Sequence, residues 1–476
     1  MTDSSALSAQ AASDPGRKRF TLLVWGAVLF IVATLLFMAQ LPEFLYWPVR
    51  ILFAAAVGWL AIATFLTLRA ARFDTKKVVF SLVLVVLLYG ALFLICFVFV
   101  KLMAARDERM ASVKTTSLSE KARSATRKLI KGNHPALFDA EAGWVPRPDY
   151  QWKIHKIGVQ GLRGDRVYPE SPADEEKRIL CLGDSFTFGY EVEDDQTFPS
   201  HGEQLRPETE WLNLGICGTG LTQALQHYRK TGRKFGGKYV VIGFMTKDAK
   251  RTVNCFRGFV SQDDITPFAQ PFAKVSDGQF SIEDNPYQEI SDYQKLLDNE
   301  EEELQKLYQL DYLSWSKQRA STNPIVRTLR YIWERRSVDR NVSILLNRTR
   351  DGYGTFRLID DPYGSSIWHP DSPGFQANAQ VFDLFYKEII EDGREPLIVI
   401  LPSGRDVEDR HEGRRAAHAS LLEYLQDKGY RHFDFLDSLE AIYKDKLSPD
   451  PLYVRTHFNG ATNKLLAEEI IKALSL

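Results

Sequence analysis

The sequence predicts an α/β domain built in three layers on a parallel sheet, preceded by three transmembrane helices. Two observations lead to this fold class. Nearly all long uncharged apolar runs lie before residue 105, whereas most of the charge lies after it. Beyond residue 150, short apolar runs that end in small residues alternate with helical stretches. Alternating strands and helices are typical of a parallel sheet with helices on both faces.

Length, charge and cysteine content exclude several classes of protein. A chain of 476 residues corresponds to two or three domains. The formal charge of −1 argues against nucleic acid as a partner, because a phosphate-binding surface needs a basic excess. Four cysteines are too few for a disulfide scaffold or a Cys-rich zinc module. The sequence also has no metal-ligand spacing, phosphate loop or dinucleotide fingerprint, so we expect no metal and no cofactor.

Three uncharged apolar segments, residues 20–41, 51–68 and 78–100, are the predicted membrane spans. A helix of about 20 apolar residues crosses the hydrocarbon core of a bilayer. For the second and shortest segment, a buried core helix is the alternative. The first segment does not resemble a signal peptide, because its apolar stretch is long and no small-residue cleavage site follows it.

Basic residues predict how these spans are oriented. They cluster in the N-terminal tail at 17–19 and in the loop between the second and third spans at 69–77. Because positively charged loops stay inside, we expect a cytoplasmic N-terminus and an external domain after residue 104. Residues 1–104 are then a cytoplasmic tail and three-helix membrane anchor, and 105–149 a stalk or linker.

Residues 150–476 are the predicted catalytic domain, with an insertion at about 256–375. Strands are expected at 178–182, 211–214, 238–242, 396–401 and 432–436. Helices are expected at 195–205, 219–233, 376–392, 413–428 and 460–475. Ligands of such sheets bind at the carboxyl ends of the strands, and the unusual loops of this sequence lie there.

The most informative of these loops is Gly183-Asp184-Ser185, directly after the first predicted strand. A serine at this position has its hydroxyl at the edge of the sheet, where a base can activate it as a nucleophile. The alternative is structural, because Asp184 or Ser185 could simply cap the following helix.

The order of the motifs resembles that of the SGNH, or GDSL, hydrolase family, whose fold is flavodoxin-like. By this resemblance Ser185 is the nucleophile and His457, in His457-Phe-Asn-Gly460, is the general base. Gly218, in a block that begins at Asn213, corresponds to the oxyanion-hole glycine and acts with the N–H of Ser185. Asp184 and Asn213 are supporting residues, and the resemblance implies a bacterial source.

Two positions depart from the family pattern. The asparagine that donates to the oxyanion falls here on Lys247 or Asp248. An ionised aspartate cannot donate, so either Lys247 supplies the donor, or Asp248 is reoriented, or the site is weakened. The aspartate expected two or three residues before His457 is also missing, which leaves Asp450 as the candidate acid partner. A backbone carbonyl is the alternative partner for the histidine.

The resemblance implies a serine esterase or O-acetyltransferase that acts on acyl esters. The predicted spans and loop charges place it in the bacterial inner membrane with its C-terminal domain in the periplasm. Its expected substrates are acyl esters of envelope or exported polysaccharide. Its expected partners are the lipid bilayer and a separate membrane protein that donates the acyl group. The alternative is a weak or inactive SGNH fold that binds glycan or supports an assembly. Catalysis requires His457 within hydrogen-bond reach of Ser185, with an acid or a carbonyl behind it.

Overall fold

The computed structural model of the chain describes residues 117–261, 266–276, 278–312, 365–368, 370–413 and 415–476. The three predicted spans lie outside these residues. Among the helices of the described part, none combines the length and the apolar character needed to cross a bilayer. The predicted fold class is therefore corrected to an α/β domain, and the three transmembrane helices are not supported. The periplasmic location stays a prediction.

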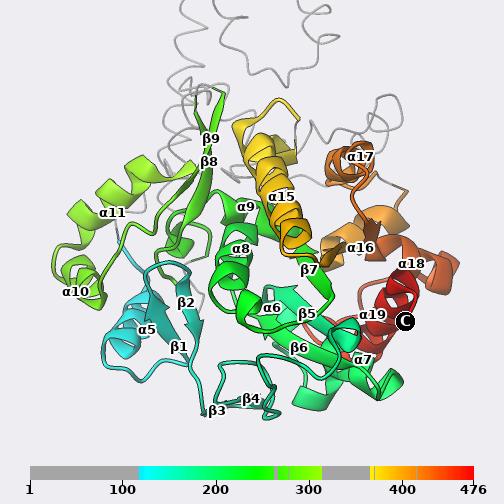
Figure 1. Cartoon of the computed structure of the whole chain (residues 1–476). Helices are drawn as coiled ribbons and strands as arrows, with labels where there is room; N and C mark the ends of the chain where they lie inside the picture. The colour runs from blue at the N-terminus through cyan, green and yellow to red at the C-terminus, as the bar shows by residue number, and fades with distance from the viewer. Residues whose placement is uncertain (1–116, 262–265, 277, 313–364, 369, 414) are drawn as a thin grey trace, which may run out of the picture. The chain divides into compact units, whose positions relative to one another are not determined.

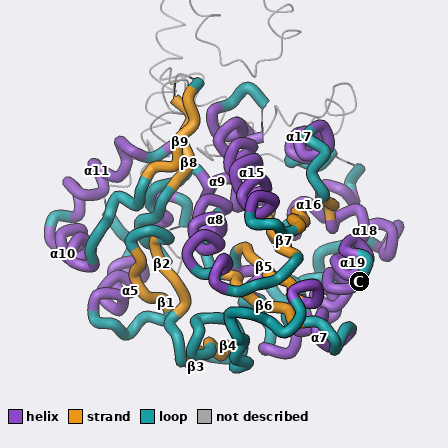
Figure 2. Tube along the Cα trace, in the orientation of Figure 1, coloured by secondary structure: helices purple, strands orange, loops and turns teal. Residues whose placement is uncertain are grey.

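The domain is built on one parallel sheet of five strands (Figures 1 and 2). These strands are β5 (Arg178–Gly183), β6 (Glu210–Gly215), β7 (Tyr239–Met245), β10 (Glu395–Leu401) and β11 (His432–Asp434). Their order across the sheet is β11-β10-β7-β5-β6, which reads 2-1-3-4-5 when the five are numbered along the chain. This is the flavodoxin-like order. The predicted parallel α/β sheet is confirmed, with each strand close to its expected range.

Helices cover both faces of the sheet. On one face α8 (Leu221–Lys230) and α15 (Pro373–Glu391) pack together, and on the other lie α7 (Phe198–Leu205), α18 (Phe435–Tyr443) and α19 (Gly460–Leu474). The helix expected at 413–428 is shorter and spans Ala419–Asp427, and a separate helix precedes it at Gly404–His411. The remaining helices near the sheet are α6 (Ser185–Phe188), α9 (Ala249–Thr252), α16 (Gly404–His411) and α17 (Ala419–Asp427).

The strands are apolar without alternation because both faces are covered. Every residue of β5 and β7 is buried, as expected for parallel strands enclosed by helices. Val241 and Val399 belong to the core cluster with Ile470 of α19, whereas the Phe244 ring packs 5.0 Å from that of Phe382 on α15. Fully burying such a side chain stabilises the fold by about 1.5–3 kcal/mol. The two helical layers therefore hold the sheet edge in a fixed position.

Residues before β5 pack on the domain, including part of the predicted stalk. They form α5 (Glu120–Ile130) and two antiparallel hairpins, β1 (Ala136–Asp139) with β2 (Gly143–Pro146) and β3 (Tyr150–Trp152) with β4 (His155–Ile157). Arg123 of α5 forms an ion pair of 2.8 Å with Glu300. Trp144 of β2 is 1% exposed, and its Nε1 donates to the carbonyl of Cys217 at 3.0 Å. The first hairpin thus reaches the loop that follows β6.

Part of the predicted insertion forms two strands and two helices. These are β8 (Phe272–Ser276), β9 (Gln279–Glu283), α10 (Ile290–Asp298) and α11 (Glu300–Leu310). The strands pair in an antiparallel hairpin separate from the main sheet. The insertion therefore leaves the order of the five parallel strands unchanged.

A buried histidine links the carboxyl ends of three strands. His418 Nε2 lies 2.9 Å from Asp434, the last residue of β11, and its Nδ1 lies 4.0 Å from Asp406 of α16. Asp406 also accepts a hydrogen bond of 2.7 Å from the hydroxyl of Thr246 at the end of β7. Burial lowers the pKa of His418, but the hydrogen bond and charge of Asp434 and the charge of Asp406 outweigh it and raise the pKa, against a smaller opposing effect of Arg410.

We expect His418→Gln to lower the free energy of unfolding by about 3–5 kcal/mol at pH 5.5, because it leaves buried carboxylates without their cation. A folded-state pKa above the unfolded value of about 6.5 means that this contribution is complete at lower pH. It is lost as pH rises through the folded pKa. Urea denaturation of both proteins at pH 5.5 and pH 9 measures the difference, which should shrink at the higher pH. An equal difference at both values would contradict a charged His418.

Candidate active site

Ser185 lies at the carboxyl end of β5 and is the first residue of the short helix α6. Asp184 caps this helix, and its Oδ1 accepts a hydrogen bond of 2.8 Å from the N–H of Phe186. Gly215 lets α6 lie directly on β6, since a Cβ at that position would come within 2.3 Å of the Phe188 backbone nitrogen. The serine is therefore held rigidly at the sheet edge, 7% exposed. In this loop Asp184 caps the helix, and Ser185 is placed where a nucleophile is expected.

The structure brings His457 to Ser185 although 272 residues separate them. The Nε2 atom of His457 lies 2.8 Å from Ser185 Oγ. The imidazole packs between two aromatic rings, 4.8 Å from that of Phe186 and 5.4 Å from that of Tyr190. Asn459 caps α19 immediately after this loop, so the helix fixes the loop's exit. The serine–histidine geometry is that of a hydroxyl nucleophile and its general base.

Behind the histidine lies Glu191, a residue that the sequence analysis did not select. One of its carboxylate oxygens, Oε2, lies 3.6 Å from His457 Nδ1, and Thr456 Oγ1 lies 3.0 Å from the same nitrogen. At 3.6 Å the carboxylate is beyond hydrogen-bond length and acts on the ring as a charge. Oε2 also accepts hydrogen bonds from the backbone N–H groups of Arg455, Thr456 and His457, at 3.1, 2.9 and 3.1 Å.

These contacts keep Glu191 ionised. Burial raises the pKa of Glu191, but the interaction with the His457 side chain and the N–H groups of Thr456 and His457 outweigh it and hold the pKa well below its usual range. A carboxylate here stabilises the imidazolium that forms when His457 takes a proton. The same contacts anchor the histidine loop to the segment that follows α6.

Asp450, the predicted acid partner, does not have this position. It is exposed, and the carboxylate beside His457 is that of Glu191. The carboxylate beside His457 therefore does not come from the residues just before the histidine. It comes from the segment that follows the nucleophile. Glu191 is six positions after Ser185 and directly follows Tyr190, whose ring packs on that of His457. Its closeness to the serine in the sequence is the one feature from which its role could have been predicted.

Gly218 lies in the loop that follows β6. Its φ of +82° is left-handed, and a Cβ would meet Thr266 Oγ1 at 2.5 Å, so glycine is required. The loop is fixed to the nucleophile strand, because the N–H of Ile216 donates to the carbonyl of Gly183 at 3.0 Å. Backbone N–H groups from this loop and from the first residue of α6 suit an oxyanion hole.

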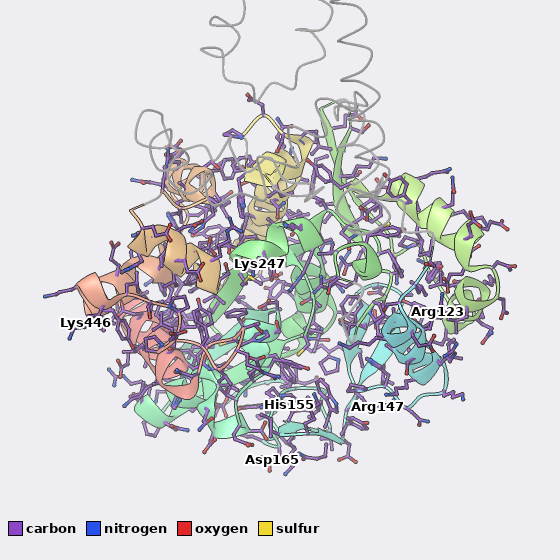
Figure 3. All side chains as sticks on the ribbon, turned by 180° about the vertical axis from the view of Figure 1, so that it is seen from behind. Arg123, Arg147, His155, Asp165, Lys247 and Lys446 are labelled. Carbon is purple, nitrogen blue, oxygen red and sulfur yellow. The ribbon has the colours of Figure 1, made fainter. Side chains whose placement is uncertain are left out.

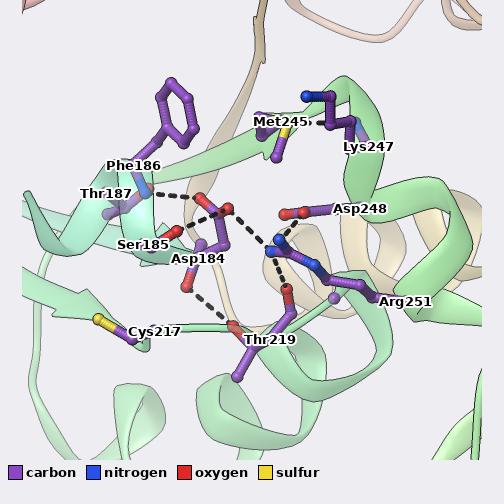
Figure 4. A network of polar contacts seen from close by, with 12 residues as sticks. Asp184, Ser185, Phe186, Thr187, Cys217, Thr219, Met245, Lys247, Asp248 and Arg251 are labelled. Carbon is purple, nitrogen blue, oxygen red and sulfur yellow. Dashed lines mark hydrogen bonds and ion pairs between the residues drawn. The ribbon is translucent and has the colours of Figure 1, made fainter. Parts of the chain in front are cut away.

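Lys247 and Asp248, the two candidates for the missing oxyanion donor, take separate positions. Lys247 is exposed (Figure 3), whereas Asp248 is 2% exposed. Asp248 Oδ1 lies 2.7 Å from Arg251 Nη1. The same nitrogen lies 3.2 Å from Asp184 Oδ2, and Figure 4 shows the two carboxyl groups pointing toward one another beside the guanidinium. The structure thus places Asp248 behind Asp184, and leaves Lys247 without a contact to Ser185 among those described.

Arg251 thus connects Asp248 to the segment that carries the nucleophile. Asp184 Oδ2 is 3.4 Å from Ser185 Oγ, so the guanidinium holds the carboxylate that touches the serine. Burial raises the pKa of Asp248, Arg251 opposes this effect, and the charge of Asp184 and a hydrogen bond with it raise the pKa further. The pKa ends well above its usual value, so we infer that Asp248 is the neutral member of the pair. Arg251 was not among the predicted site residues, because its role depends on contacts with Asp184 and Asp248 that no local pattern reveals.

Asn213 connects the strand before the oxyanion loop to the helix of the nucleophile. Its Nδ2 donates to the carbonyl of Thr187 at 2.9 Å, and its Oδ1 accepts from the N–H of Gly215 at 3.1 Å. The side chain therefore ties the end of β6 to α6. Asn213 positions the helix of the nucleophile, as the supporting role predicted for it requires.

Comparisons with known proteins gave matches among solved structures alone. No family model and no curated protein matches the chain. A structure described as a lipolytic protein of the G-D-S-L family from Desulfitobacterium hafniense is 11% identical with a TM-score of 0.29, covering 63% of this chain and 99% of that one. A structure described as an acylhydrolase from Bacteroides fragilis is 12% identical with a TM-score of 0.30, covering 64% and 89%.

Because these identities and TM-scores are low, the fold is assigned from the chain's own features. The strand order is flavodoxin-like, the Gly-Asp-Ser motif follows the first strand of the sheet, and the His457 loop precedes the last helix. These features match the order of motifs by which the sequence was compared with the family. The chain therefore has a flavodoxin-like α/β fold, and its motifs stand in an order that resembles that of the SGNH/GDSL hydrolase family.

Proposed function

We propose that this chain is a serine ester hydrolase or O-acyltransferase that acts on acyl esters of a polysaccharide. The observation that carries the proposal is the contact of 2.8 Å between His457 Nε2 and Ser185 Oγ, with Glu191 behind the imidazole. An inactive glycan-binding scaffold does not require this pairing of nucleophile, base and carboxylate. The geometry therefore favours catalysis over that alternative.

The reaction follows from the positions of these groups. Ser185 Oγ attacks the acyl carbonyl carbon while His457 Nε2 takes the hydroxyl proton. The carbonyl oxygen becomes an oxyanion that the N–H groups of Ser185 and Gly218 stabilise. His457 then gives the proton to the departing alcohol, and the acyl group stays on Ser185. Water or a sugar hydroxyl attacks this ester with His457 as base, which releases the acyl group and restores the serine.

Aromatic side chains beside the base support a carbohydrate ester as substrate. Trp152 and Tyr190 are half-buried with their ring centroids 5.5 Å apart, and Lys153 Nζ lies 5.0 Å from the Trp152 centroid. Rings with an apolar face and a polar neighbour suit a sugar, which has apolar C–H faces and hydroxyl edges. In a transferase the acyl group would come from a separate donor protein.

The test is hydrolysis of p-nitrophenyl acetate by the full chain and by Ser185→Ala. Removing the nucleophile should lower kcat by at least about 10³-fold, since triad serines contribute at least this much. A hydrolase transfers the acetyl group to water alone, whereas a transferase also gives an acetylated product when a soluble oligosaccharide is present. Mass spectrometry of the oligosaccharide distinguishes the two. Equal turnover by wild type and Ser185→Ala would refute the proposed nucleophile.

A further inference from the structure

A small apolar pocket lies beside the active site and has no part in the steps above. Its walls come from the two N-terminal hairpins, α6 and the loop after β6, and include Ala136, Trp144, Trp152, Ile157, Phe188 and Cys217. Its volume is about 30 Å³. Since about 10–15 Å³ of such space holds one water, the pocket has room for two or three groups of that size.

The pocket borders the oxyanion side of the site. Cys217 directly precedes Gly218, and its carbonyl is fixed by the hydrogen bond of 3.0 Å from Trp144 Nε1. Trp144 Cζ2 lies 3.6 Å from the point where a Cβ on residue 218 would be. The same indole therefore forms a wall of the pocket and a neighbour of the oxyanion glycine.

Two further walls of the pocket, Phe188 and Trp152, lie near the nucleophile and the base. Phe188 is the last residue of α6, the four-residue helix that begins at Ser185. The Trp152 ring lies 5.5 Å from that of Tyr190, which in turn lies 5.4 Å from the imidazole of His457. Walls of one pocket thus adjoin the segments that carry all three reacting groups.

We propose that this pocket receives the alkyl part of the acyl group and limits it to an acetyl or propionyl chain. The inference rests on the proposed function and adds the class of acyl group to it. A carbonyl oxygen held at the N–H groups of Ser185 and Gly218 leaves the alkyl chain beside this wall. Burying its carbons there removes apolar surface from water, and the small volume leaves no space for a longer chain.

The test compares kcat/KM of the full chain on p-nitrophenyl acetate, propionate, butyrate and octanoate. Wild type should prefer acetate or propionate to octanoate by at least about tenfold, the discrimination that a few methylenes give in an apolar site. Ala136→Leu, which fills the pocket, should lower kcat/KM for acetate about tenfold. Ile157→Ala, which enlarges it, should shift the preference toward butyrate. Ala173→Leu, the same change as the first at an exposed position, should match wild type.

The outcomes separate this inference from the function on which it rests. Wild-type activity that depends on Ser185 but rises steadily with chain length would overturn the pocket assignment alone. The same conclusion would follow if Ile157→Ala kept the wild-type preference. Circular dichroism identifies a variant that fails to fold. If Ala136→Leu or Ile157→Ala fails, the chain-length preference of the other variant tests the pocket assignment. Inactivity of wild type on every ester would overturn the proposed function and this inference with it.

Discussion

Glu191→Gln is expected to lower kcat by about 10³–10⁴-fold with little change in KM, the effect of neutralising the triad carboxylate in serine proteases. The substitution keeps an oxygen for the backbone N–H groups of residues 455–457 but removes the charge that faces His457 Nδ1. The imidazolium of the transition state then forms without its counter-ion. Because KM reports substrate binding and Glu191 lies behind the histidine, the loss should appear in kcat. Steady-state kinetics on p-nitrophenyl acetate measure both constants.

Asp450→Asn is the matched control. It removes the carboxylate that was the predicted acid partner of His457, but this residue is exposed. Its kcat should stay within about twofold of wild type, since surface substitutions away from special features have small effects. A large loss in Asp450→Asn together with a small loss in Glu191→Gln would return the acid role to Asp450. The low pKa of Glu191 also means that protonation of this residue does not set the acid limb of the pH profile.

Arg251→Met is expected to lower the free energy of unfolding by about 3–5 kcal/mol, as removal of one partner from a buried ion pair does. The guanidinium lies between Asp184 and Asp248, whose side chains are 1% and 3% exposed. Without it the two carboxyl groups face each other beside Ser185. The Asp184 carboxylate is then free to accept a stronger hydrogen bond from the Ser185 hydroxyl, which competes with the contact to His457, so kcat should fall as well. Urea denaturation and ester hydrolysis measure the two effects.

Asp248→Asn provides the comparison for this network. A neutral amide resembles the protonated carboxyl that the raised pKa implies for Asp248, so the substitution should cost less than about 1 kcal/mol of stability. Stability equal to that of Arg251→Met would show that Asp248 is ionised and needs the arginine. An Arg251→Met protein as stable as wild type would show that the buried carboxyl groups do not depend on the guanidinium.

The fold was predictable because its strands are buried on both faces. Apolar runs such as Arg178–Gly183 and Glu395–Leu401 show no alternation and end in small or turn-forming residues, which identifies parallel strands. The short Gly-Asp-Ser loop likewise predicts a serine at the sheet edge. The segments expected to cross a membrane lie outside the described residues, and hydropathy alone gave that expectation.

The partners of the site residues were less predictable, because they depend on contacts between distant segments. Glu191 and His457 are 266 positions apart, and four acidic residues lie between 191 and 195. With the family position before the histidine unfilled, the sequence left Asp450 as the candidate, and this residue is exposed. The protonation of Asp248 depends on burial beside Asp184, which no local pattern reveals. Sequence indicates which chemistry is present, and the packed structure decides which carboxyl group performs it.

The most direct test of the account is covalent capture of the nucleophile. The full chain is treated with diisopropyl fluorophosphate, and mass spectrometry of its peptides locates the adduct. We predict one phosphorylated serine, Ser185, which lies 2.8 Å from its base in the structure. Glu191→Gln should react more slowly, and Asp450→Asn at the wild-type rate. No adduct on Ser185, or equal labelling of another serine in wild type and Ser185→Ala, would contradict the account.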